Sequence, residues 1–397
     1  MRILFLSPRQ CFPPVTGAKL REYYLAKGLG ERGGLVHLFF AGAGDPAQGA
    51  DAAFPRKAVA VPAPRRYTPA KIARGIFGRW PLPVVNYTSE EMRAALAAAL
   101  AAERFDLAHI DSIHMAAYAS MLPRGLPVVY DWHNIESELM RRYGARAGFL
   151  RSAYAAATAR RLAALERRIL RAAFGHIVCS ERERDELRRV APEARIAVVE
   201  NGVDTRYFQP GGGERGRWRV VFVGSMNYHA NVEAAVWFAH AVWPAVRERF
   251  PGWTLTVVGS DPAPAVLALR GEKSVEVTGS VPDVRPYYRE AVAAVAPLHT
   301  GGGTRLKILE AMAAGAPVVS TPLGAEGLAV APGGNILIAD GPADWVACLA
   351  ELADRPEVWG RIAQAGLELV RARYDWGLLG QSLHDTYCGW ISSPARV

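Results

Sequence analysis

The sequence predicts an α/β fold built from two doubly wound domains, and three observations lead to this prediction. The chain has 397 residues, more than one hydrophobic core usually supports. Apolar strands alternate with helical patterns in two successive series, as in parallel sheets covered by helices. Between the two series, residues 207–213 contain Pro210 and three glycines, a composition typical of a linker. We therefore expect the domains 1–210 and 211–375, facing each other across a cleft.

The first domain begins with a strand, a turn and a helix. Arg2–Ser7 is an apolar run that predicts a buried strand, and Leu20, Leu25 and Leu29 then recur on one helical face. Gly17 stands at the mouth of this helix, where a missing side chain either allows a tight turn or lets a ligand approach the backbone. Later strands are predicted at 35–40, 58–61, 107–110, 127–130, 176–179 and 196–200.

A polar segment, residues 131–136, follows the strand predicted at 127–130. Ligands of open α/β sheets gather at the carboxyl ends of the strands, so we interpret His133 as a functional residue. The alternative is a helix-capping cluster made by Asn134 and Glu136.

The second series of strands and helices predicts the second domain. Its helices include one at 231–250, and a final helix at 376–390 has no strand partner, so we expect it to cross back to the first domain. Its strands are predicted at 218–224, 255–259, 275–277, 291–298 and 317–321.

The most informative stretch of the second domain joins its strand 291–298 to the next helix. Three glycines, Gly301–Gly303, separate the strand from a helix that Gly315 closes. Such a turn presents backbone N–H groups that suit a phosphate, although tight packing also uses glycine. Arg305 and Lys307 would add positive charge. Glu310 lies one turn further along the helix, where a carboxylate could accept hydrogen bonds from sugar hydroxyls.

The net charge of +9 is concentrated in the first half of the chain. Residues 65–80 contain five basic residues and no acidic one, and residues 141–189 contain thirteen arginines and five acidic residues. Ile72, Ile76 and Phe77 recur at helical spacing within the first of these stretches. This pattern predicts either an amphipathic helix at an anionic membrane surface or a surface helix packed on the sheet. We expect no nucleic-acid partner, because the glycine-rich site would then have no role.

The chain carries no recognisable secretory signal and no apolar run of membrane-spanning length. Its cysteines are not paired in CxxC motifs, so a disulfide framework or zinc site is not expected. They are Cys11, Cys179, Cys348 and Cys388. These features favour a cytoplasmic protein. Peripheral attachment to the cytoplasmic face of the membrane is compatible with that location.

Three motifs together resemble the retaining family 4 glycosyltransferases of the GT-B fold, especially those of bacterial extracellular polysaccharide clusters. They are the Pro13-Pro14-x-x-Gly17 loop, the segment 201–204, and residues 302–319 with the sequence GGTRLKILEAMAAGAPVV. The resemblance runs nearly end to end, and the last motif is the most specific. It implies a nucleotide-diphosphate-sugar donor held by the C-terminal domain, with no further cofactor. The acceptor, a lipid-linked or polysaccharide-precursor glycan, would be held by the N-terminal domain.

The resemblance also implies roles for single residues. Glu310 matches the family glutamate that binds the donor ribose, and His133 matches the histidine near the transferred sugar. Gly17 matches the N-terminal glycine loop that faces the phosphates. Further donor-binding residues are expected in two loops of the C-terminal domain: Ser225, Asn227, Gly302, Gly303 and Thr304.

The sequence departs from the family pattern at two places. Many members have a second glutamate eight positions before the one at Glu310, and here that position is Gly302. Many also place Arg and Lys in the loop 224–229, which contains neither. Arg305 and Lys307 are therefore our candidates for the charge that binds the diphosphate, and with His133 they form the expected catalytic set.

The expected chemistry follows from these groups. Cations, backbone N–H groups and a helix N-terminus can stabilise the departing diphosphate. The sequence has no Asp-x-Asp triplet, which favours a metal-independent route, and retention is implied by the resemblance alone. We expect front-face attack by the acceptor hydroxyl. A nucleotide-sugar epimerase, a transferase acting on a soluble natural product and a non-catalytic partner subunit remain as alternatives.

Overall fold

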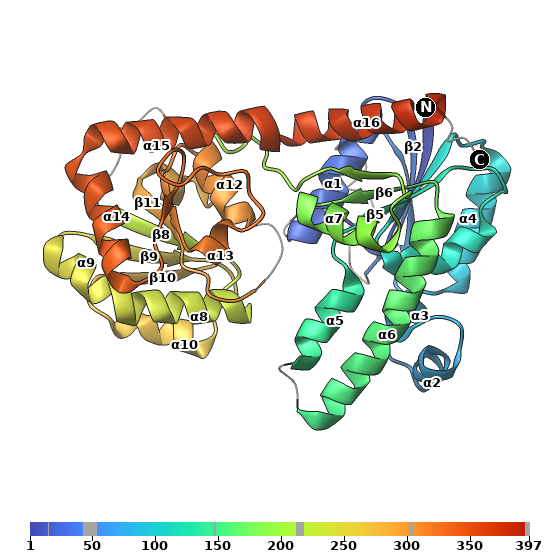
Figure 1. Ribbon diagram of the computed structural model, residues 1–397, viewed down its shortest axis with the longest axis horizontal. Helices are drawn as coiled ribbons and strands as arrows, with labels where there is room; N and C mark the ends of the chain where they lie inside the picture. Colours follow the sequence, from blue (N-terminus) through green and yellow to red (C-terminus); the bar gives the residue numbers. More distant parts are fainter. Residues whose placement is uncertain (15, 43–53, 146–147, 212–217, 302–304, 394–397) are drawn as a thin grey trace. The chain divides into compact units, whose positions relative to one another are not determined.

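The computed structural model describes residues 1–14, 16–42, 54–145, 148–211, 218–301 and 305–393. The chain forms two compact units (Figure 1). Unit 1 consists of Met1–Glu200 together with Leu379–Val397, and unit 2 consists of Asn201–Leu378. Each unit contains one parallel β-sheet with helices packed against it. The predicted pair of doubly wound sheets is thus confirmed.

The sheet of unit 1 has seven strands in the order β3-β2-β1-β4-β5-β6-β7, and every neighbouring pair is parallel. The strand order reverses between β1 and β4, which is where ligands bind in sheets of this type. The strands are β1 (Arg2–Ser7), β2 (Gly34–Ala41), β3 (Lys57–Pro62), β4 (Leu107–Asp111), β5 (Val128–Trp132), β6 (Gly175–Val178) and β7 (Ile196–Val198).

Side-chain caps mark where several helices of unit 1 begin. The side chains of Thr16, Ser89 and Ser180 accept hydrogen bonds from backbone N–H groups three residues ahead, as N-cap residues do. The segment expected as a helix at 113–121 is a 3-10 helix, η1. The helices are α1 (Gly17–Gly30), α2 (Pro69–Phe77), α3 (Leu82–Val85), α4 (Glu90–Ala102), η1 (Ile113–Met121), α5 (Glu136–Ala145), α6 (Phe149–Ala172) and α7 (Glu181–Val190).

The sheet of unit 2 has six parallel strands in the order β10-β9-β8-β11-β12-β13, and its order reverses between β8 and β11. An apolar cluster on this sheet includes the fully buried rings of Trp243 and Trp345. The strands are β8 (Arg219–Val223), β9 (Thr254–Val258), β10 (Val275–Gly279), β11 (Ala291–Ala296), β12 (Val318–Ser320) and β13 (Leu337–Ile338).

The long helix expected at 231–250 is divided into an α-helix, a π-helical turn and a second α-helix. Pro244 lies just after the π-helical turn, and its missing N–H cannot continue a regular ladder. No helix among the described residues has both the length and the apolar character needed to cross a bilayer. The helices are α8 (His229–Trp237), η2 (Phe238–Val242), α9 (Trp243–Arg249), α10 (Pro264–Ala268), η3 (Leu269–Gly271), α11 (Arg285–Arg289), α12 (Leu306–Ala313), α13 (Pro322–Ala325), α14 (Pro342–Asp354), α15 (Pro356–Leu369), η4 (Val370–Tyr374) and α16 (Trp376–Ser392).

The division between the units lies after Glu200, upstream of the expected boundary near residue 210. The reason is that the segment after Glu200 bonds to unit 2. The Val203 N–H donates to the carbonyl of Tyr374 over 2.8 Å, and the Thr205 hydroxyl donates to Asp375 over 2.5 Å. The glycine-rich composition therefore indicated a turn-rich segment, whereas the hydrogen bonds determine to which unit it belongs.

The C-terminal part of α16 packs within unit 1. The ring of His109 lies 2.6 Å from the Tyr387 hydroxyl and stacks on Phe5 at 4.1 Å. A Cβ added to Gly28 of α1 would lie 2.6 Å from the Cα of Gly380 in α16. The two helices approach this closely because neither residue has a side chain.

Candidate active site

In unit 1, polar side chains meet at the carboxyl edge of the central strands. Asp111 is the last residue of β4, and it lies in register with Asp131 of the neighbouring strand β5. His133 follows β5 directly, and Arg21 and Glu22 come from α1. The parallel arrangement brings these residues together at the point where the strand order reverses.

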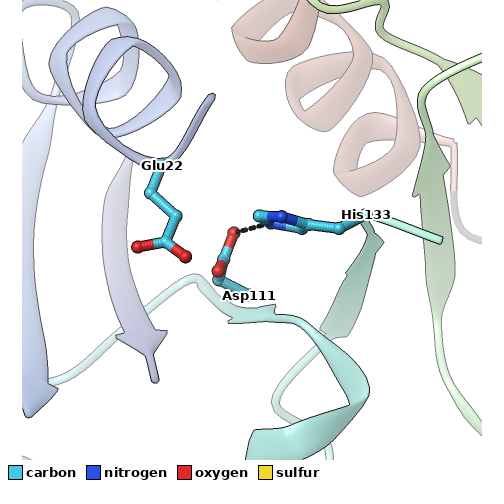
Figure 2. Close-up of side chains that lie close together, drawn as sticks. All are labelled: Glu22, Asp111 and His133. Carbon is cyan, nitrogen blue, oxygen red and sulfur yellow. Dashed lines mark hydrogen bonds and ion pairs between the residues drawn. The ribbon is translucent and has the colours of Figure 1, made fainter. Parts of the chain in front are cut away.

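The imidazole of His133 forms an ion pair with Asp111, with 2.8 Å between Nε2 and Oδ1 (Figure 2). Glu22 points from α1 toward the Asp111 carboxylate. The ligand atoms of Glu22, Asp111 and His133 all lie within 4.8 Å of one another. The side chains of Glu22 and Asp111 are fully buried and that of His133 is 11% exposed. The histidine is thus the member of this cluster that a ligand can reach.

The pKa values within this cluster move in opposite directions. Burial raises the pKa of Glu22 well above its usual value, and the negative charge of Asp111 raises it further. Burial would also raise the pKa of Asp111, but the charge and hydrogen bond of His133 outweigh it and lower that pKa. For His133, burial lowers the pKa, yet Asp111 outweighs burial and raises it. The His133–Asp111 pair therefore stabilises the charged form of both its members, whereas burial and the charge of Asp111 oppose the ionisation of Glu22.

A second buried pair fixes the neighbouring strand. The Arg21 guanidinium binds both carboxylate oxygens of Asp131, at 2.9 and 2.6 Å, and donates to the Val199 carbonyl at 2.7 Å. Such a bidentate pair is geometrically specific. On the other side, Arg9 forms an ion pair with Glu22 at 2.8 Å. The two arginines compensate carboxylates that are otherwise costly to bury.

Two overlapping groups have the residue types of a metal site: Glu22, Asp111 and His133, and His109, Asp111 and Asp131. Arg21 already binds both oxygens of Asp131. A cation bound to the first group would displace the His133–Asp111 bond and lie close to the Arg9 guanidinium. We therefore interpret the cluster as a hydrogen-bonded acid–base group, and a metal-independent reaction remains our prediction.

In unit 2, Lys307 lies beneath the loop that follows β8. Its Nζ donates to Asn231 Oδ1 over 2.8 Å and lies 4.2 Å from the centre of the Phe222 ring. The Asn231 amide in turn donates to the Ser225 carbonyl over 2.9 Å. A Cβ at Gly224 would lie 2.9 Å from Lys307 Nζ and 2.7 Å from the Asn231 amide nitrogen. The helix α12 therefore brings a cation to a loop that has none of its own.

Burial and charge also change the ionisation of the groups on α12. Burial lowers the pKa of Lys307 to about 7, and the positive charge of Arg305 lowers it further. Burial raises the pKa of Glu310, while a hydrogen bond from Tyr288 opposes the rise. The Tyr288 hydroxyl lies 3.3 Å from Glu310 Oε2. Lys307 and Glu310 are one helical turn apart, so both side chains belong to one face of α12.

The other residues that the sequence predicts for the site lie in different environments. Arg305 is buried at the N-cap position of α12. Ser225 and Asn227 are exposed in the loop after β8, and Gly17 is the exposed first residue of α1. Gly302, Gly303 and Thr304 lie outside the described residues.

Sequence reasoning missed Asp111 and Glu22, which complete the cluster around His133. Asp111 could have been found from its place directly after the apolar run 107–110, because polar residues at strand ends are frequent site residues. Glu22 had a weaker signal, an acidic residue next to Arg21 in a helix that also carries Lys19 and Lys27. Neither signal indicates that the two carboxylates meet.

These two sheets, each with its order reversed at a central strand, define the GT-B fold. The chain is similar in structure to sucrose-phosphate synthase from Thermosynechococcus elongatus, with a TM-score of 0.71, 17% identity and 99% of both chains covered. It is also similar to HepE of Anabaena in complex with UDP and glucose, with a TM-score of 0.65 and 16% identity over 98% of this chain and 99% of that one. At such identities the likeness concerns the fold alone.

Family models match most of the chain. Residues 15–207 match the model described as Glycosyltransferase Family 4, and residues 217–355 match Glycosyl transferases group 1. Glycogen synthase of Mycobacterium tuberculosis is 28% identical over 247 residues, covering 58% of this chain and 58% of that protein. The protein belongs to the family 4, group 1 glycosyltransferases with the GT-B fold, which confirms the expected family.

Proposed function

We propose that this protein transfers a sugar from a nucleotide-diphosphate sugar to an acceptor hydroxyl, with retention of configuration and without a metal. The observation that carries the proposal is the half-buried Lys307, whose ammonium group lies beside the loop after β8 in unit 2. A lysine ammonium that is partly removed from water is costly unless an anion compensates its charge. A donor diphosphate is an anion of the required kind.

Lys307 takes the place of the cations that many family members carry in the loop after the first strand of this unit. The residues 224–229 contain neither Arg nor Lys, yet Lys307 Nζ lies 2.9 Å from the position that a Cβ of Gly224 would occupy. Breaking the sugar–phosphate bond builds negative charge on the leaving diphosphate. A positioned cation stabilises that charge more in the transition state than in the bound donor, which is what accelerates the reaction.

The donor would also contact Glu310, at the ribose, and the loop containing Gly302, Gly303 and Thr304, at the sugar and diphosphate. The bond from Tyr288 supports the first assignment, because it leaves the other oxygen of Glu310 available to a ribose hydroxyl. HepE, with the same fold, was solved with UDP and glucose. A UDP-sugar is therefore the first donor to test.

Unit 1 would contribute His133 at the transferred sugar, with Asp111 and Glu22 holding the ring. Gly17 would allow the donor phosphates to approach the start of α1. The acceptor hydroxyl would attack from the face that the diphosphate leaves, and the leaving phosphate would take its proton. No enzymic nucleophile is needed for this route.

A lipid-linked or polysaccharide-precursor glycan is our proposed acceptor class, with the protein attached peripherally to a membrane. Exposed apolar and basic side chains on unit 1 support this. Phe77 at the end of α2 is 87% exposed, and Phe149 and Leu150 at the start of α6 are 86% and 81% exposed. Apolar residues so exposed among arginines are typical of an interfacial surface.

A nucleotide-binding screen tests the proposal first. The purified protein is heated with UDP, GDP, ADP or dTDP and with their sugars, and the stabilisation is recorded. A ligand present at a hundred times its Kd should add about 2.7 kcal/mol to the free energy of unfolding. Glu310→Ala should abolish the response to the active donor, whereas Glu357→Ala, at an exposed site of unit 2, should retain it. A protein that binds no nucleotide sugar would contradict the proposal.

The reaction itself is followed by NMR of the anomeric proton, with acceptors from a membrane extract. A glycoside with the anomeric configuration of the donor is the expected product. Release of free sugar without a glycoside would favour the epimerase alternative. Donor binding without either product would favour the non-catalytic subunit.

A further inference from the structure

Unit 1 contains an open groove of about 320 Å³ between α6 and η1, apart from the cluster around His133. Its floor is formed by Val128 and Tyr130 of β5. Leu165 and Ile169 of α6 form one wall, and the indole of Trp80 borders it. The groove is therefore lined mainly by apolar groups, which favours an apolar ligand.

Two arginines lie at the groove beside Trp80. Arg79 and Arg168 place their guanidinium carbons 5.3 and 5.0 Å from the centre of the Trp80 rings. Both side chains are exposed. In the part of the chain that the structure describes, neither forms an ion pair or a hydrogen bond with another side chain or with the backbone. An anionic group at the end of an apolar ligand would find both charges available.

The wall that carries Trp80 is held in place by α6. The Arg161 guanidinium donates to the backbone carbonyls of Gly75, Ile76, Gly78 and Trp80. These bonds satisfy the last backbone carbonyls of α2 and those of the segment that follows it. The wall of the groove is therefore ordered before a ligand binds, and binding carries no entropy cost for ordering it.

The groove opens next to an apolar and basic surface. Ile76 and Phe77 of α2 are 53% and 87% exposed, a few residues before Trp80. Residues 65–80 contain five basic residues and no acidic one. A ligand in the groove therefore lies beside a surface suited to an anionic bilayer.

The lining and the charges together indicate the kind of ligand. The groove has apolar walls along β5 and α6 and two guanidinium groups beside Trp80, which match a hydrocarbon chain that ends in an anionic group. We propose that the groove binds one acyl chain of an anionic membrane phospholipid, with Arg79 and Arg168 holding its phosphate. This inference refines the proposed membrane attachment, but it does not depend on sugar transfer.

Decyl phosphate, kept below its critical micelle concentration, is a monomeric probe for the groove. We expect saturable binding in titration calorimetry. Ala172→Trp would place an indole in the groove, since Ala172 lines it, and should weaken binding at least tenfold. Ala156→Trp is the matched control, because Ala156 is exposed on the same helix outside the groove. Equal binding by wild type and Ala172→Trp would overturn the proposal.

The charge is tested with the double variant Arg79→Gln/Arg168→Gln, with Arg167→Gln on the exposed face of α6 as the control. The double variant should bind decyl phosphate more weakly but bind the uncharged decyl maltoside as wild type does. It should also bind vesicles of phosphatidylcholine with phosphatidylglycerol about fivefold more weakly per arginine lost. An unchanged affinity for decyl phosphate would overturn the role of the arginines.

Vesicle flotation, which measures membrane binding, distinguishes a phospholipid from other ligands of the groove. We expect Ala172→Trp to lower binding to vesicles containing phosphatidylglycerol. Unchanged vesicle binding would mean that the exposed surface of α2 alone makes the contact. Loss of transfer to a lipid-linked acceptor with unchanged vesicle binding would assign the groove to the acceptor. A concentration-dependent dimer that Ala172→Trp abolishes would assign it to a second copy. Each of these three results would overturn the phospholipid proposal.

Discussion

Lys307 should make the affinity for the donor depend on pH, and the environment of its ammonium group gives the direction and the magnitude of that dependence. Burial lowers the pKa of Lys307 to about 7, from an ordinary value of 10.5. A bound diphosphate would restore the ordinary pKa because it compensates the charge. Below pH 7 the lysine is already charged. Above pH 7 the protein must take up a proton on binding, which costs about 1.36 kcal/mol per pH unit.

The affinity for a nucleotide sugar should therefore fall about tenfold between pH 6 and pH 8, and about fiftyfold between pH 7 and pH 9. Titration calorimetry measures this, and repeating it in buffers of different ionisation enthalpy counts the protons taken up. A nucleotide sugar is preferable to a free diphosphate because both of its phosphates are esterified, so that it has no group titrating near pH 6.

Lys307→Gln should bind the donor weakly at every pH, because it has no proton to exchange. Lys273→Gln, at an exposed site of unit 2, should keep both the affinity and the pH dependence of the wild type. A wild-type affinity that is the same at pH 6 and pH 9 would refute the reasoning. If the donor affinity of Lys307→Gln still depended on pH, the dependence would belong to another titrating group.

Two further predictions concern unit 1. Asp111→Asn should lower turnover on the order of a hundredfold and leave donor affinity unchanged, because His133 loses the ionised partner that orients it. The pKa of His133, followed by NMR, should fall in the same variant; unchanged turnover and pKa would argue against this positioning role. Gly380→Ala should destabilise the protein by about 1–3 kcal/mol in denaturant unfolding, because its Cβ would lie 2.9 Å from the Cα of Gly28. Gly389→Ala, with open space at its Cβ, should cause no such loss, and equal unfolding midpoints for the two variants would contradict the steric argument.

The sequence alone was sufficient for the local structure and the fold class. Apolar runs such as 291–298 predicted buried strands because a strand covered on both faces excludes water along its whole length. Gly315 was expected to close the helix before it, and it adopts the left-handed conformation there, with φ of +79°. The glycine-rich motif predicted the family, which the family models confirm. Each of these features depends on residues close together in the chain.

The tertiary structure alone decided which distant groups meet. Glu22 comes from a helix, Asp111 from the end of β4 and His133 from the position after β5, and they converge because β4 lies between β1 and β5. Lys307 was expected to supply charge to a phosphate, but its bond to Asn231 depends on how α12 packs against α8 and β8. Sequence patterns record which face of an element is apolar. They do not record which strand is its neighbour, because many strand orders bury the same apolar faces equally well.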